Sequence, residues 1–154
     1  MAGSLAFDDG SWWSGAFTGF HPTATVAFET NGQVDAGQHP GIYAEFGISP
    51  TLKFSLRPPR DAAAGSTRPQ LTLSAPITVG LSVHDYYELA GRDDTFGYLD
   101  VGLALGMPLP LPKRFGSWSM TLAADTFVLG DNTALVNHDD HFEVVGRLGL
   151  SCEL

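Results

Sequence analysis

The sequence predicts an all-β fold, an antiparallel up-and-down meander that forms a transmembrane β-barrel or part of one, with about 7–8 strands in this chain. The first observation is strict alternation over residues 71–83, where every odd position is apolar. A period of two places alternate side chains on opposite faces of a strand. The second is the length of the run, 13 residues, because strands of soluble proteins are typically about 5–6 residues long. The third is its other face, which holds only Thr, Ser, Pro and Gly, as expected of a strand whose apolar face meets lipid.

The same alternation recurs along the chain and predicts the remaining strands. They lie near residues 22–30, 41–57, 70–85, 95–108, 115–129 and 141–154, with a weaker candidate at 11–20. Alternation continues across Ser49-Pro50, which predicts one long strand bent at the proline. No segment shows a helical period. In chain order the alternating apolar positions outside 71–83 are Ala24, Val26, Phe28, Ile42, Ala44, Phe46, Ile48, Pro50, Leu52, Phe54, Leu56, Leu99, Val101, Leu103, Leu105, Met107, Trp118, Met120, Leu122, Ala124, Val128, Phe142, Val144, Leu148, Leu150, Cys152 and Leu154.

Composition sets limits on the class of protein. Charged residues make up 16% of the chain, below the roughly 25% of soluble domains. The net charge of -9 argues against nucleic acid as a partner, because phosphate binding needs clustered Lys and Arg. The N-terminus lacks the basic start and apolar stretch of a signal peptide, and the strands are odd in number, whereas bacterial single-chain barrels have even numbers. We expect a single barrel domain over residues 1–154, truncated at its N-terminus, with residues 1–20 poorly defined.

The connections between strands are sorted by charge. In a meander, alternate connections lie at the same end, so residues 58–69 and 108–114 share one end with Arg60, Arg68, Lys113 and Arg114. The other end holds Asp35, Glu88, Asp93, Asp94, Asp131, Asp139 and Asp140. This sorting is typical of outer-membrane barrels with compact inner turns and long polar outer loops. Aromatic residues near strand ends fit girdles at the membrane boundary, and they are Tyr86, Tyr87, Phe96, Tyr98, Phe115 and Trp118.

The polar face is the predicted functional surface. Its ionisable residues face the lumen of the predicted barrel: Glu45, Lys53, Arg57, Asp100, Asp125, Glu143, Arg147 and Glu153. Charges of opposite sign that are withdrawn from water should pair. In a narrow barrel such pairs fill the lumen, and in a wider one they line a pore and bias the passage of ions. Asp100, Asp125 and Arg147 lie mid-strand, so we expect them to meet there.

Other chemistry has weaker support. Residues 137–141 carry two His and two Asp, but consecutive residues point in different directions and the calcium-loop spacing is absent. Ser82 and His84 lack the strand-to-helix elbow of a Gly-x-Ser-x-Gly nucleophile, and no third catalytic member is evident. We therefore expect no enzyme activity, no metal site and no organic cofactor.

The C-terminal strand resembles that of bacterial outer-membrane β-barrel proteins, in particular porin-like barrels of unassigned function. Their closing pattern is a polar residue, a glycine two positions later, and hydrophobic residues three and five positions beyond it. Arg147, Gly149, Cys152 and Leu154 occupy these places, although the last two positions usually favour aromatics. The resemblance covers residues 41–154. It implies a place in the bacterial outer membrane, the lipid bilayer and the barrel assembly machinery as partners, and a porin-like passive channel or a small structural barrel as function.

One alternative from another class is a soluble lipocalin-like β-barrel that binds an apolar ligand. Its apolar face would point inward and its Ser/Thr/Gly face would meet water. The scarcity of Lys and Glu on that face makes this arrangement less favourable.

Overall fold

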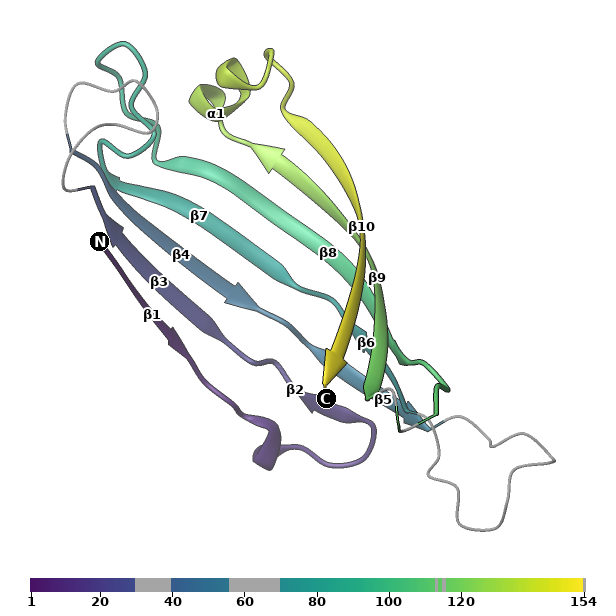
Figure 1. Ribbon diagram of the computed structural model, residues 1–154. Helices are drawn as coiled ribbons and strands as arrows, with labels where there is room; N and C mark the ends of the chain where they lie inside the picture. The colour runs from purple at the N-terminus through teal and green to yellow at the C-terminus, as the bar shows by residue number, and fades with distance from the viewer. Residues whose placement is uncertain (30–39, 56–69, 113, 115, 154) are drawn as a thin grey trace.

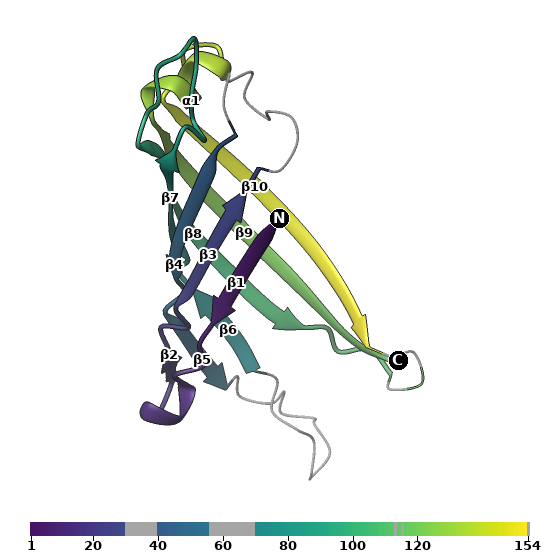
Figure 2. The same ribbon diagram turned by 90° about the vertical axis from the view of Figure 1, so that its left-hand side faces the viewer.

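The computed structural model describes residues 1–29, 40–55, 70–112, 114 and 116–153. The fold is all-β, as predicted: one antiparallel sheet of 10 strands in meander order, curved but not closed into a barrel (Figure 1, Figure 2). The strands are β1 (Ala2–Ala6), β2 (Phe17–Gly19), β3 (Thr23–Phe28), β4 (Ile42–Ile48), β5 (Thr51–Ser55), β6 (Gln70–Ser74), β7 (Ile77–His84), β8 (Phe96–Pro108), β9 (Ser117–Leu129) and β10 (Phe142–Glu153). A 3-10 turn, η1 (Gly10–Trp12), and one short helix, α1 (Asp131–Val136), complete the described elements.

Prolines divide three of the long strands in two. Pro22 separates β2 from β3, Pro50 separates β4 from β5, and Pro76 separates β6 from β7. A proline has no N–H to donate, so the ladder is interrupted at each of these positions. Neighbouring backbone groups bond across the breaks, including Ala75 N–H to Pro50 O at 3.0 Å and Gly102 N–H to Pro76 O at 2.8 Å. Apolar and polar faces keep their parity across Pro50, as the sequence predicted.

Two parts of the N-terminal region differ from the prediction. The run 11–20 holds the end of η1 and only three strand residues, those of β2. Strand β1 was not predicted, because Leu5 is its one large apolar residue and shows no alternation. The strand is instead held by its antiparallel pairing with β3, in which Leu5 lies opposite Ala24.

Helix α1 is the other unpredicted element. Its six residues lie in the predicted connection 130–141, so the predicted strands on either side are intact. A helix this short covers less than two turns and leaves no periodic signal. Its Ala134 is fully buried, and the Asn132 side-chain amide donates to the carbonyls of Tyr87 and Arg92, both at 2.7 Å. These contacts join the two acidic connections at one end of the sheet, as the meander predicted (Figure 1).

Register aligns the apolar side chains into rows across the sheet. One row runs Phe46, Val79, Leu99, Val128 and Phe142 from β4 to β10. Paired residues in a sheet share a face, so the apolar positions of every long strand lie on one face. A second row holds Leu105, Leu122 and Leu148.

The apolar face is the exposed face. Leu103 is 56% exposed and Leu148 is 68% exposed. Among the described residues the only buried hydrophobic ones are Ala44 and Ala134. A soluble sheet instead buries its apolar face against another layer. No helix among the described residues is long and apolar enough to cross a membrane.

Candidate functional site

The candidate site is the polar face of the sheet, which is the concave one. Side chains on the concave side of a curved sheet converge and cover one another, whereas those on the convex side diverge. The polar face shows convergence: Tyr43 on β4 and Tyr98 on β8 meet hydroxyl to hydroxyl at 3.0 Å across the intervening β7. Asp125 on the same face is 2% exposed. Polar groups are thus gathered on the inside of the curve and apolar groups on its outside.

Asp125 and Arg147 form the central ion pair of this face. The Nε of Arg147 donates to Asp125 Oδ2 at 2.6 Å, and its Nη2 donates to Oδ1 at 2.8 Å. Adjacent strands position the two residues, since Asp125 lies opposite Val145 on β10, two residues from Arg147. Two parallel N–H···O bonds are the strong bidentate form of an arginine–carboxylate contact. The pairing predicted from the sequence is therefore present.

Asp100 lies beside this pair on β8. It is opposite Phe127, and the next residue on the same face, Gly102, is opposite Asp125. The Oδ1 atom of Asp100 is buried and has no hydrogen-bond partner within the described part of the chain. Its position brings a second carboxylate within electrostatic range of Asp125 and Arg147. The three residues predicted to meet mid-strand are neighbours in the structure.

Glu45 organises a second cluster, which is made of tyrosines. Its Oε2 accepts hydrogen bonds from the hydroxyls of Tyr43, at 2.6 Å, and Tyr98, at 2.7 Å. The Tyr43 ring packs against Tyr86 at a centroid distance of 4.9 Å, and Tyr86 packs edge-on against Tyr87 at 5.2 Å. The girdle at the membrane boundary that the sequence predicts for Tyr86, Tyr87 and Tyr98 stays a prediction. In the structure the Tyr98 hydroxyl lies on the polar face, where it donates to Glu45, and the rings of Tyr86 and Tyr87 pack against Tyr43.

Glycines on the polar face make room for these large side chains. A Cβ atom added to Gly80 would lie 2.4 Å from Cε1 of the Tyr98 ring, and one added to Gly102 would lie 2.5 Å from Oδ1 of Asp125. Gly106 on the same face is different, since the nearest atom to an added Cβ is 3.7 Å away. The side chains of Tyr98 and Asp125 therefore need glycine at positions 80 and 102, because any larger residue there would overlap them.

We expect Gly80→Ala to destabilise the fold by about 1–3 kcal/mol, the usual cost of overpacking. The added methyl would displace the Tyr98 ring from its bond to Glu45. Gly106→Ala is the matched control, and it should be neutral or slightly stabilising, because glycine inside a strand costs roughly 0.5–1 kcal/mol relative to alanine. Urea unfolding in detergent measures both. Equal effects of the two substitutions would show that the Tyr98 ring is free to move aside.

The other predicted lumen residues are more scattered. Glu143 lies opposite Phe127 and accepts from the Asn137 amide at 3.1 Å. Lys53 is exposed on β5, opposite Thr72, and lines a cavity described below. Glu153 is exposed at the end of β10, opposite Ser117. Arg57 lies outside the described residues.

The predicted assembly signal maps onto the edge strand β10. Gly149 lies opposite Thr121, and Cys152 is exposed and lies opposite Trp118 on the apolar face. Leu154 lies outside the described residues. The role of these residues as an assembly signal stays a prediction.

The side chains of two motifs noted in the sequence make local contacts. The Ser82 hydroxyl donates to Asp93 at 2.9 Å, whereas His84 contacts Asp85 at 3.0 Å. Residues 137–141 form a turn in which Asp140 accepts from the backbone N–H of Phe142. In the described ranges, no group of three or more His, Cys, Asp or Glu side chains is placed to hold a metal ion.

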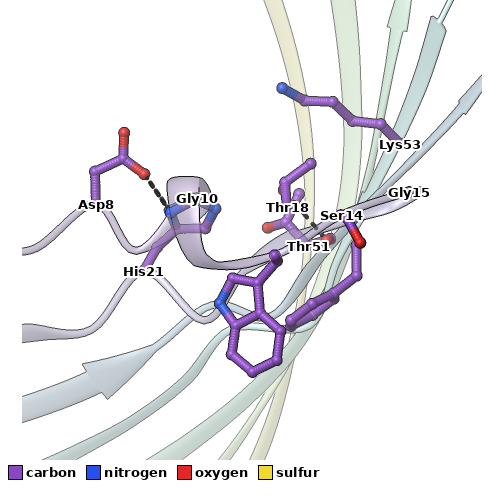
Figure 3. Close-up of a pocket in the computed structure, with 10 residues that line it drawn as sticks. Asp8, Gly10, Ser14, Gly15, Thr18, His21, Thr51 and Lys53 are labelled. Atoms are coloured by element: carbon purple, nitrogen blue, oxygen red, sulfur yellow. Dashed lines mark hydrogen bonds and ion pairs between the residues drawn. The ribbon is translucent and has the colours of Figure 1, made fainter.

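A cavity of about 520 Å³ lies at the opposite end of the sheet from α1. Figure 3 shows Asp8 and His21 on one side of it and Lys53 on the other, with Thr18 and Thr51 between them. His21 Nδ1 is 3.7 Å from Asp8 Oδ1. Asp8 and Asp9 place acidic groups at the end that the sequence predicted to be basic. Of the four basic residues assigned to that end, only Arg114 is among the described residues.

Asp9 anchors the N-terminal segment beside this cavity. It is buried and accepts hydrogen bonds from the indole N–H of Trp13 at 2.7 Å and from the backbone N–H groups of Phe20 and His21. Burial alone would raise the pKa of Asp9, but these hydrogen bonds to the carboxylate outweigh it and lower the pKa to about 2. Asp9 thus ties η1 to the turn that joins β2 and β3.

A lowered pKa in the folded state makes the contribution of Asp9 pH-dependent in a defined direction. The contribution is complete above the ordinary value of 3.8 and is lost as pH falls through about 2. We expect the NMR shift of the Trp13 indole proton to titrate with a midpoint near 2, and this titration to vanish in Asp9→Asn. A midpoint near 3.8 in the parent would contradict the hydrogen-bonded arrangement.

Sequence reasoning placed Glu45, Asp100, Asp125 and Arg147 on the correct face and predicted that the last three meet, but it missed the tyrosine partners of Glu45. The signal for Tyr43 and Tyr98 was present, because both share the parity of the polar face. Asp9 had no comparable signal, since it lies outside any alternating run.

Comparison with protein-family models, with curated proteins and with solved structures finds no match to this chain. Inference about function therefore rests on the geometry of the two faces.

Proposed function

We propose that this chain is part of a β-barrel of the bacterial outer membrane that acts as a porin-like passive channel or as a small structural barrel. The observation that carries the proposal is the inverted burial of the sheet. Its apolar rows are exposed on the convex side, and its ion pair and carboxylate–tyrosine cluster are gathered on the concave side. Lipid is the solvent in which an outward apolar face is stable.

The same burial disfavours the soluble lipocalin-like alternative. A barrel that binds an apolar ligand inside needs an apolar concave face. Here that face holds Asp125, which accepts hydrogen bonds from Arg147, and Glu45, which accepts them from Tyr43 and Tyr98. A convex face with Leu103 and Leu148 more than half exposed would also be a large apolar patch in water.

Passive passage or simple occupancy of the membrane fits the polar face better than covalent chemistry. Its central ionisable groups form an ion pair, Asp125 with Arg147, and a hydrogen-bonded cluster, Glu45 with two tyrosines. Such groups either fill a lumen or bias which ions pass. Asp100, with a buried oxygen beside the ion pair, adds a second carboxyl group at mid-strand.

Membrane insertion and conductance test the proposal. We expect the protein to partition into lipid vesicles and to require detergent for extraction. If the lumen is open, the inserted protein should produce discrete steps of ionic conductance in planar bilayers. Asp125→Asn should then reduce the preference for cations, because it removes a negative charge from the lumen. Insertion without conductance supports the structural barrel. A protein that stays in the aqueous phase without detergent would overturn the proposed function.

A further inference from the structure

The two margins of the sheet are open, and they differ in length. Within the described residues, β10 pairs only with β9 at one margin; at the other margin β1 pairs only with β3, and the three-residue β2 pairs only with β5. The outer edge of β10 therefore presents backbone groups along 12 residues, whereas β1 has only 5 residues. In lipid every unpaired backbone N–H and C=O group costs several kcal/mol, so an open edge cannot face the bilayer. Something must cover β10.

Strands β1 and β10 cannot pair with each other in the antiparallel manner found in the rest of the sheet. Every pairing along the path β1, β3, β4, β7, β8, β9, β10 is antiparallel, and this path contains an even number of pairings. Strands β1 and β10 therefore run in the same direction, as their arrows show (Figure 1). A direct seam between them would be parallel, and it would leave more than half of β10 unpaired. An odd number of further strands restores an antiparallel seam on both sides.

Arg147 indicates which kind of side chain the strand that covers β10 must carry. Its guanidinium has five N–H donors, and the two bonds to Asp125 use one donor on each of two nitrogens. The remaining N–H groups have no acceptor among the described residues, and the side chain is 61% exposed. On the other face of β10, Phe142, Val144 and Leu148 are exposed beside the same edge. A strand that covers this edge must be apolar on one face and carry a hydrogen-bond acceptor near Arg147 on the other.

We propose that the outer edge of β10 docks a further amphipathic strand that runs antiparallel to it and places a carboxylate against Arg147. The inference rests on the proposed barrel, because the bilayer is what requires the edge to be covered. The docked strand extends the apolar rows of the convex face and turns the Asp125–Arg147 pair into a chain of alternating charges along the concave face. Main-chain hydrogen bonds would supply the affinity and the arginine the register, as in other cases of strand addition.

The chain itself supplies a probe for this edge. A synthetic peptide with the sequence of β9, residues 117–129, already matches β10 in antiparallel register and carries an aspartate for Arg147. In that register Trp118 lies opposite Cys152, and Val128 lies opposite Phe142 at the other end of the strand. Cys152 is the chain's single cysteine and is exposed, so disulfide formation with a peptide cysteine reports strand direction.

We expect a peptide with Trp118→Cys to cross-link to Cys152 in detergent with oxidised glutathione, and a peptide with Val128→Cys to cross-link far less. Adding Asp125→Ala to the first peptide should weaken binding about tenfold, since a charge-assisted hydrogen bond is lost. Amide exchange of residues 142–153 should slow on binding while that of the chain's own 117–129 stays unchanged.

Several results would overturn the docking proposal. Cross-linking only by the Val128→Cys peptide would show parallel pairing, and faster exchange in the chain's own β9 would show strand replacement. A chain that is dimeric without peptide and binds none would show that a second copy covers the edge. Vesicle partitioning of the same sample tests the proposed function separately, since its loss with cross-linking intact overturns only the membrane assignment.

Discussion

Leu103→Lys is expected to destabilise the membrane-inserted protein by about 2–4 kcal/mol, the cost of a lysine at the bilayer midplane. Leu103 lies near the middle of β8, in register with Ala124 on the apolar face, and is 56% exposed. In water such an exposed position would tolerate a lysine within about 0.5 kcal/mol. The size of the loss therefore separates a lipid-facing surface from a solvated one. Urea unfolding from lipid vesicles, followed by tryptophan fluorescence, measures it.

Thr121→Lys is the matched control for this experiment. Thr121 is exposed on the neighbouring strand β9, but it lies on the polar face opposite Gly106 and Gly149. A lysine there would extend over glycines into the concave side and should change the unfolding free energy little. Equal losses at Leu103 and Thr121 would mean that the two faces do not meet different solvents. A loss at Thr121 alone would reverse the assignment of the faces.

The assignment of faces is also the part of the structure that the sequence predicted best. Side-chain direction in a strand is fixed by a period of two, so parity alone placed Leu103 and Asp125 on opposite faces. Register then follows, because a slip of one residue would exchange the faces. Alternation even survives the break at Pro50, where the hydrogen-bond ladder does not.

Elements that depend on contacts distant in the chain could not be predicted from local sequence patterns. Strand β1 forms because β3 offers it an edge, and Leu5 alone gives no alternating pattern. Helix α1 is held by the bonds of Asn132 to Tyr87 and Arg92 rather than by its own periodicity. Such features need the meander to be in place before their partners are known.

The polar cluster shows the same limit at the level of side chains. Tyr98 occupies a strand end, where an aromatic residue is as compatible with a membrane girdle as with the inner face. Its position was decided by Gly80 beneath its ring and by Glu45 within reach of its hydroxyl. The identity of a small residue on the neighbouring strand, read in register, is the signal that would have predicted it.

Arg147→Ala is expected to destabilise the protein by about 2–3 kcal/mol. Removing one partner of a fully buried ion pair costs about 3–5 kcal/mol, because the remaining charge is left uncompensated. Asp125 is 2% exposed, but the Arg147 side chain is 61% exposed, so solvent screening reduces the loss. Lys53→Ala, at an exposed basic residue of the same face, is the control, and it should stay within about 0.5 kcal/mol. Urea unfolding in detergent measures both variants.

A double-mutant cycle tests whether the loss of stability in Arg147→Ala comes from its ion pair with Asp125. Asp125→Asn retains the shape of the side chain and removes its charge, so Arg147→Ala should cost less in that background than in the parent. The difference is the coupling between the two charges, separate from any packing of the arginine stem on the polar face of the sheet. Equal costs in both backgrounds would show that Arg147 stabilises the sheet through its stem alone. In that case the bidentate contact would not be an energetic anchor of the concave face, and a carboxylate on a neighbouring strand would have little to gain from Arg147.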